Sequence, residues 1–176
     1  MKHFSLLVLA LVLACAFPVQ VAATTLTHSG AQVEITVPDG WKSNQEADVI
    51  KIAAPDDSMA VVFTVVAEEK ADKAFDAIEK ALEKSVGQIL YDNDGKPIEE
   101  KINGMPTWEW DGATKDGKLK VYSLSIETPS GKTLVVYWFG TPESEKKYEA
   151  DIKTIAQGLK PLASAAPAAP AEGGDK

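Results

Sequence analysis

The stretch "TWEWDGATKDGKLKVYSLSIETPSGKTLVVYWF", residues 107 to 139, decides the fold. Runs of apolar and β-branched residues alternate in it with the turn sequences Asp116-Gly117 and Pro129-Ser130-Gly131. The pattern predicts three strands, at residues 107–113, 118–128 and 132–139. Because the connections are short, we expect an antiparallel meander. The last strand is apolar on both faces, which is typical of a strand covered on both sides.

Three further strands are expected before this meander. The segment 33–37 alternates Val33, Ile35 and Val37 with polar residues, as a half-buried strand does. Apolar runs predict two more strands, at 49–53 and 59–67, joined by a turn at 54–58.

Two segments change to the helical period. Residues 71–87 place Phe75, Ile78, Leu82 and Val86 on one side, and Gly87 fits the left-handed position after a helix. A second helix is expected to begin at Pro142, after Thr141 as its cap, and to stop near Gly158 and Pro161. Its apolar stripe is made of Tyr148, Ile152, Ile155 and Leu159. The sequence therefore predicts an α+β fold, an antiparallel sheet with helices on both faces, in an α/β/α sandwich.

The chain begins with the pattern of an export signal. Lys2 and His3 precede an apolar run from Phe4 to Phe17, and small residues lead to a cleavage site after Ala23. We expect a signal peptide at 1–23, a folded domain at 24–162 and a disordered Ala/Pro-rich tail at 163–176. The protein is then exported and periplasmic. In the alternative, "VLAC" is a lipoprotein box, and a lipid on Cys15 anchors the protein in the cell envelope.

The composition argues against several classes of function. The formal net charge is −8 and arginine is absent, so a nucleic-acid partner is excluded for want of a basic field. Once the signal is removed no cysteine remains, which excludes disulfides and thiolate chemistry. No cofactor is expected, and the mature chain is expected to contain no transmembrane segment.

Trp108 and Trp110 are the candidate surface for a partner or ligand. On a strand they share one face, while Thr107, Glu109 and Asp111 share the other, which we expect to point to water. Burial of each indole would contribute at most roughly 4–6 kcal/mol. We therefore favour a core role for the tryptophans, with an exposed aromatic pair as the alternative.

No motif names a catalytic, cofactor or metal residue. The segment "YDNDGK" at 91–96 lacks the first and last ligands of a calcium loop, and "SGKT" at 130–133 lies between strands and lacks the first glycine of a phosphate loop. After signal removal His28 is the sole histidine, which excludes a histidine-dependent triad.

The "PDGW" turn at 38–41, the "INGMP" lead-in at 102–106 and the order of elements resemble the PsbP-like superfamily. The resemblance covers about residues 30 to 162. The superfamily includes the PsbP subunits of photosystem II, a Ran-binding nuclear import factor and DcrB-type exported bacterial proteins. These members work by docking onto other proteins, so the resemblance implies a binding or accessory role.

The leading hypothesis is an exported, non-enzymatic binding or accessory protein whose partner is an envelope protein. One alternative is an envelope hydrolase that uses carboxylates or a divalent metal, which would require a concave pocket with converging acids. The other is the lipoprotein tethered through Cys15.

Overall fold

The computed structural model describes residues 23–66, 79–80, 82–84 and 86–163, and they form the α+β fold that the sequence predicts. The strands are β1 (Thr24–His28), β2 (Val33–Val37), β3 (Lys42–Glu46), β4 (Val49–Ala53), β5 (Met59–Val66), β6 (Ile89–Tyr91), β7 (Ile98–Ile102), β8 (Met105–Thr114), β9 (Lys120–Glu127), β10 (Thr133–Gly140) and β11 (Lys160–Pro161). The helical elements are the 3-10 turn η1 (Asn93–Gly95), α2 (Pro142–Lys147) and α3 (Glu149–Gly158).

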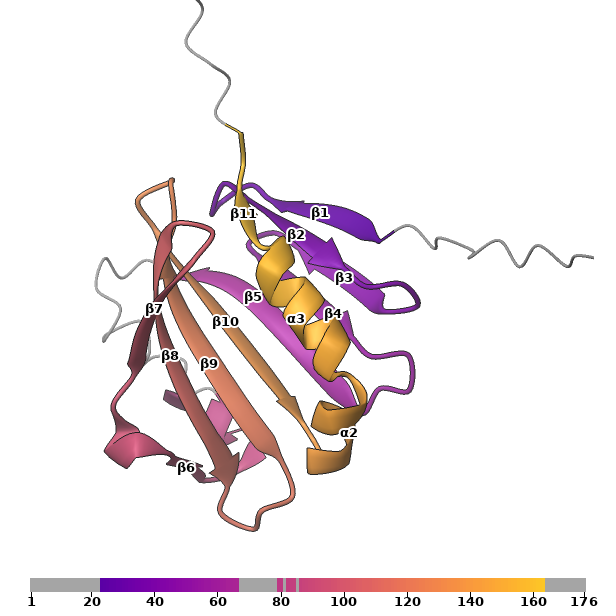
Figure 1. Cartoon of the computed structure of the whole chain (residues 1–176), viewed down its shortest axis with the longest axis vertical. Helices are drawn as coiled ribbons and strands as arrows, with labels where there is room; N and C mark the ends of the chain where they lie inside the picture. The colour runs from indigo at the N-terminus through magenta and orange to yellow at the C-terminus, as the bar shows by residue number, and fades with distance from the viewer. Residues whose placement is uncertain (1–22, 67–78, 81, 85, 164–176) are drawn as a thin grey trace, which may run out of the picture.

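The strands form two antiparallel sheets (Figure 1). The larger has eight strands in the order β3-β4-β5-β10-β9-β8-β6, with β7 also paired to β8. The smaller has the order β1-β2-β11 and lies at the upper end of α3 in the view of Figure 1. The predicted meander is confirmed as β8, β9 and β10, whose last strand continues the sheet by pairing with β5.

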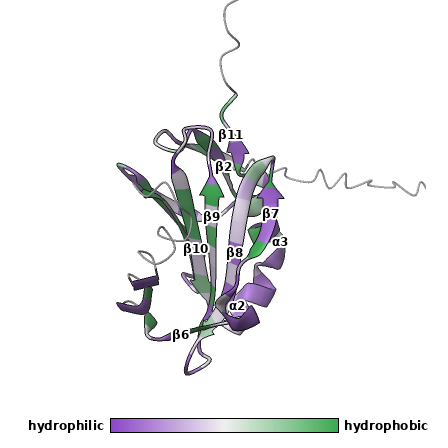
Figure 2. Ribbon diagram, turned by 90° about the vertical axis from the view of Figure 1, so that its left-hand side faces the viewer, coloured by the Kyte–Doolittle hydropathy of each residue, from purple (hydrophilic) through white to green (hydrophobic). Residues whose placement is uncertain are grey.

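Both faces of the larger sheet carry apolar side chains, as the two apolar faces of β10 predict. On the face toward α3, called here the helix face, Phe63, Leu124 and Val136 are buried and join Ile155 of α3 in the main core. The opposite face has a smaller cluster, made of Leu82, Ile89, Val121 and Val135. Helices α2 and α3 lie together on one side of the sheet, and most of their visible surface is hydrophilic (Figure 2).

The helical segment after β10 has the predicted start, but it is divided into two helices. The Thr141 side chain accepts a hydrogen bond from the Ser144 backbone N–H at 3.1 Å, so Thr141 is the cap. The predicted end near Gly158 and Pro161 is confirmed, since α3 ends at Gly158, but the single helix is wrong, because Tyr148, at φ −106° and ψ 16°, separates α2 from α3. Tyr148 and Ile155 are nevertheless buried, so the predicted stripe still faces the core.

The sequence analysis missed five strands: β1, β3, β6, β7 and β11. Strand β3 reads KSNQE and is exposed throughout, so hydrophobic periodicity has nothing to detect there. It is held as the outermost strand of the sheet by its backbone pairing with β4. The expectation of one sheet is incomplete, because β1 and β11 pair with β2 in a second sheet.

The first predicted helix lies partly outside the described residues. Residues 79–80, 82–84 and 86 are helical, and Gly87 has φ +91°, which confirms it in the left-handed position. Residues 1–22 and 164–176, which hold almost all of the predicted signal and tail, also lie outside the described residues.

Candidate functional site

The two tryptophans lie on the opposite face of the larger sheet, next to small residues. In the pairing of β8 with β9, Trp108 lies across from Ser125 and Trp110 lies across from Ser123, and both serines are fully buried. Trp110 is only 6% exposed, whereas Trp108 is half-buried. The structure therefore places Trp110 in the interior and part of Trp108 at the surface, and their use as a partner surface stays a prediction.

The other face of β8 does not point freely to water, so that expectation is wrong. Thr107 is 1% exposed, and Glu109 and Asp111 are half-buried. The physical reason is that β8 pairs with strands on both sides and this face belongs to the helix face, where Leu124 and Val136 continue the same row. Polar residues on this strand thus lie beside the main core.

A cluster of four side chains, called here the acidic face, lies on this side of the sheet: Glu109 and Asp111 of β8, Tyr122 of β9 and Glu145 of α2. Glu109 and Asp111 are two residues apart on β8 and therefore project to the same side. Asp111 lies across from Tyr122 of β9 in the strand pairing. The Tyr122 hydroxyl donates a hydrogen bond to Oε1 of Glu145 on α2. A helix and two strands thus bring three carboxyl groups around one phenol.

Burial and like charge perturb these carboxyl groups. Burial raises the pKa of Glu109 to about 7, with further contributions from the negative charges of Asp111 and Glu100. Burial also raises the pKa of Asp111, against a hydrogen bond from Glu109 that lowers it. Both carboxyl groups therefore hold a proton more tightly in the folded protein than an exposed acid does.

The acidic face lacks a close countercharge within the described part of the chain. No lysine there comes within 4.0 Å of the Glu109 or Asp111 carboxylate, although Lys120 is near enough to lower the pKa of Asp111. The four ion pairs that the described residues form all lie elsewhere on the surface. Two half-buried acids without a paired base destabilise the free protein, which is typical of a functional surface.

Exposed apolar side chains border the acidic face. Leu90 is 51% exposed and Ile98 is 53% exposed, and they are the large hydrophobic residues that stand exposed among the described residues. Leu90 lies across from Ala113 and Ile98 lies across from Glu109, so both side chains are on the same face as the acids. The surface therefore combines negative charge with apolar contact area.

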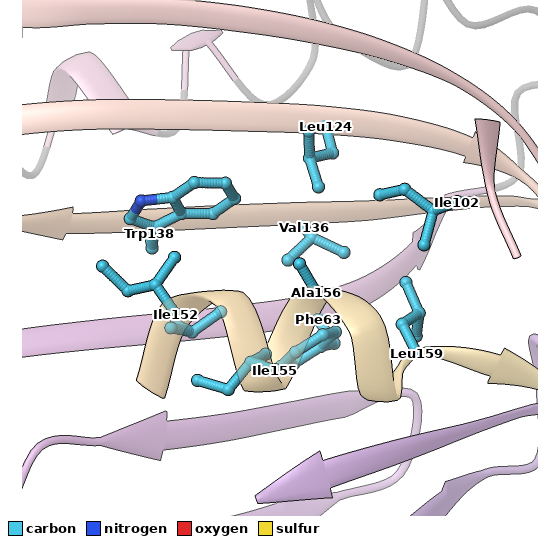
Figure 3. Close-up of a pocket in the computed structure, with 10 residues that line it drawn as sticks. Phe63, Ile102, Leu124, Val136, Trp138, Ile152, Ile155, Ala156 and Leu159 are labelled. Atoms are coloured by element: carbon cyan, nitrogen blue, oxygen red, sulfur yellow. The ribbon is translucent and has the colours of Figure 1, made fainter. Parts of the chain in front are cut away.

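An apolar crevice begins beside the acidic face and runs under α3. Trp138 of β10 stacks on Tyr122 with ring centroids 4.9 Å apart and an interplanar angle of 15°. From Trp138 the crevice passes between β10 and the side chains of Ile152 and Ile155 (Figure 3). Its volume is about 20 Å³, room for about one water molecule. Because its lining is apolar and it is nearly filled, we interpret it as packed core.

The remaining sequence candidates have structural roles. His28 is 1% exposed; its Nδ1 accepts from the Ala31 N–H at 3.3 Å, so Nε2 carries the proton and donates to the Asp48 carbonyl at 2.9 Å. The segment 91–96 forms the turn η1, and 130–133 lies at the turn between β9 and β10. Within the described ranges, no three His, Cys, Asp or Glu side chains are placed to hold a metal ion.

Cys15, the candidate for lipidation, lies outside the described residues. Among the residues that are described, none of the helices combines the length and the apolar character needed to cross a bilayer.

The acidic face is not predicted by the sequence pattern, because acids that alternate with apolar residues on a strand indicate a solvent-facing side. No sequence pattern showed that this strand is internal, because β6 and β7, which pair with β8 on the side away from β9, were not predicted. Tyr122 and Glu145 come from distant segments, and no local pattern connects them.

Comparison with known proteins supports the fold and supplies no family. No protein-family model matches the chain, and no curated protein matches it.

Among solved structures, the crystal structure of LpqN, involved in cell envelope biogenesis of Mycobacterium tuberculosis, is similar. Its TM-score is 0.55, with 17% identity over 79% of this chain and 90% of that chain. A protein of unknown function from Pseudomonas aeruginosa, PA94, has a TM-score of 0.47 and 18% identity over 81% of this chain and 99% of its own. A structure from Bacteroides thetaiotaomicron has a TM-score of 0.49 and 13% identity over 78% of this chain and 47% of its own. The similarity to LpqN shows a shared fold.

Proposed function

We propose that the protein is an exported, non-enzymatic accessory protein of the cell envelope, of the PsbP-like type, that binds a partner protein through its acidic face. The observation that carries the proposal is the half-buried carboxyl pair of Glu109 and Asp111, which has no ion pair with a described lysine and borders exposed Leu90 and Ile98. The involvement of LpqN, a protein of similar fold, in cell envelope biogenesis supports the envelope as the place of action.

The chemistry of the acidic face defines the partner that fits it. A lysine or arginine from the partner would supply the missing positive charge, and an apolar residue beside it would cover Leu90 or Ile98. Charge complementarity of this kind accelerates association and weakens as salt increases. We therefore infer a basic, partly apolar segment of an envelope protein as the partner.

Replacement of Glu109 and Asp111 tests whether the partner still binds. A photo-crosslinking residue is introduced in place of Ile98, and crosslinks in intact cells are compared between the otherwise unchanged chain and a Glu109→Gln/Asp111→Asn chain. The matched control is Glu99→Gln/Glu127→Gln, which removes the same charge from exposed positions on β7 and β9. We expect a specific crosslink that the first pair of substitutions removes and the control retains. Equal crosslinking in all three chains would contradict the proposal.

A second candidate function, an envelope hydrolase, is favoured by the pKa of Glu109. A carboxyl group that titrates near 7 can act as a general acid or base at neutral pH, and Asp111 offers the paired carboxylate. The described residues that line the adjoining crevice, however, include no carboxyl group. Hydrolysis of ester and glycoside substrates that is lost in Glu109→Gln and retained in Glu127→Gln would establish this alternative over the binding role.

The lipid tether remains a separate proposal. Mass spectrometry of the protein isolated from cells decides it, because cleavage after Ala23 leaves Thr24 as the first residue and excludes the anchor. A diacylated Cys15 at the start of the chain would establish it.

A further inference from the structure

A trough lies on the opposite face of the larger sheet, over β3, β4, β5 and β10. Its volume is about 460 Å³, within the range of roughly 300–1,000 Å³ that small-molecule sites occupy. Small side chains make the floor: Ala53 lies across from Ala60 in the strand pairing, and Val62 is two residues further along β5. One wall is aromatic, formed by the rings of Tyr137 and Phe139, whose centroids are 6.5 Å apart at an interplanar angle of 17°.

The other wall is cationic. Lys42 lies across from Ala53 and Lys51 lies across from Val62, so both lysines project to the same side as the floor. Nζ of Lys42 is 2.6 Å from Asp57, whereas Lys51 has no ion pair with any residue that the structure describes. The chain has a formal net charge of −8, yet no carboxyl group is among the described residues that line the trough. The charged side chains among these described residues, Lys42 and Lys51, are therefore opposite in sign to the chain as a whole.

We propose that this trough binds a small amphiphile with an apolar body and a single anionic end group, a carboxylate or a phosphate. The apolar body lies on Ala53 and Ala60 beside the ring of Phe139, which removes apolar surface of both molecules from water. The anionic group meets Lys51. The site is separate from the acidic face, since Glu109 and Asp111 project from the other side of the sheet, and it does not depend on the proposed partner.

Calorimetry with simple amphiphiles tests the site in the whole chain. Decanoate and decyl phosphate are the anionic probes, and decanol is the neutral analogue of the same length. We expect saturable binding of at least one anion, with decanol weaker by about threefold to fivefold, the effect of one partly exposed charge pair. Comparison of the two anions identifies the preferred end group. Salt should weaken the binding of the anion and leave decanol unchanged.

Substitutions test separately how the cationic wall and the floor of the trough contribute to binding. Lys51→Gln should reduce the affinity for the anion to that for decanol, and Ala60→Leu, which fills the floor, should abolish the binding of both. The control is Lys132→Gln, which removes a lysine from the exposed turn before β10 and should change neither. Circular dichroism confirms folding of each variant, and Lys51→Gln, at an exposed position, keeps the test decisive if Ala60→Leu fails to fold.

Three results would overturn the proposal. They are the absence of saturable binding by the unchanged chain, equal affinity for decanol and for both anions, and an equal effect of Lys51→Gln and Lys132→Gln.

Discussion

Replacement of Glu109 by glutamine should stabilise the isolated protein, although it removes a native side chain. The pKa of Glu109 rises from 4.5 to about 7 on folding, chiefly through burial and then through the charges of Asp111 and Glu100. A raised pKa in an acid means that the folded state binds the proton more tightly than the unfolded state. The ionised carboxylate therefore destabilises the fold, and glutamine, which has the same shape without the charge, removes that effect.

The expected gain in the free energy of unfolding follows from the size of the pKa shift of Glu109. At about 1.36 kcal/mol per pKa unit, the rise from 4.5 to about 7 corresponds to at most about 3 kcal/mol above the folded pKa. Because the carboxyl group is partly open to water, we reduce this to about 1–2 kcal/mol. The penalty is absent below pH 4.5, where the group is protonated in both states, and it grows as the pH rises through 7. The native protein should thus lose stability across that window, and Glu109→Gln should not.

Urea denaturation at pH 5 and pH 8 provides the assay. We expect Glu109→Gln to exceed the native chain in free energy of unfolding by about 1–2 kcal/mol at pH 8, with most of the difference gone at pH 5. Glu127→Gln, at an exposed position on β9, serves as the control and should stay within about 0.5 kcal/mol at both values. If Glu109→Gln is less stable than the native chain at pH 8, or if the difference is the same at both pH values, the carboxyl pair is not a source of strain.

Substitutions at four further positions test the packing and the helix cap by urea denaturation. Trp110→Ala should lower the free energy of unfolding by about 3–5 kcal/mol because its ring is buried, and Trp108→Ala, half-buried, should cost about half as much. Equal losses would contradict the difference in burial. Gly158→Ala would place a methyl group against the Thr36 side chain where α3 meets β2, and should cost about 1–3 kcal/mol; a neutral result would show that α3 can shift freely. Thr141→Ala removes the cap of α2 and should cost about 1 kcal/mol, whereas Thr141→Ser should retain it.

Much of the fold was accessible from the sequence because it depends on local patterns. Strand β4 at 49–53 and strand β2 at 33–37 have the predicted bounds, and Thr141 and Gly87 have the predicted roles at helix ends. Strands β3 and β7 could not be predicted from the sequence, and the reason is physical. Their residues are mostly exposed and polar, so the backbone pairing with a neighbour, rather than burial of side chains, holds them in the sheet.

The candidate site was harder to predict from the sequence, because the burial of a strand face depends on the strands and helices packed around it. Glu109 and Asp111 alternate with Trp108 and Trp110, and this pattern alone predicts a solvent-facing acidic side. Both sides are partly buried: the acids lie on the helix face beside buried Leu124, and Trp110 is buried on the opposite face. The pairing of Tyr122 with Glu145 requires β9 and α2 to meet, which follows from the closed fold and from no segment by itself.

The destabilising acids and the proposed partner are linked through a single equilibrium. A partner cation at the acidic face binds the ionised form of Glu109 better than the protonated form, so binding must lower the pKa of Glu109 from about 7 toward its ordinary value. By reciprocity, the affinity must increase as the pH rises through 7, over the same interval in which the free protein loses stability. Glu109→Gln would abolish both effects together. A partner whose affinity does not change across this interval would therefore bind elsewhere on the molecule, even if the stability of the free protein varies with pH as expected.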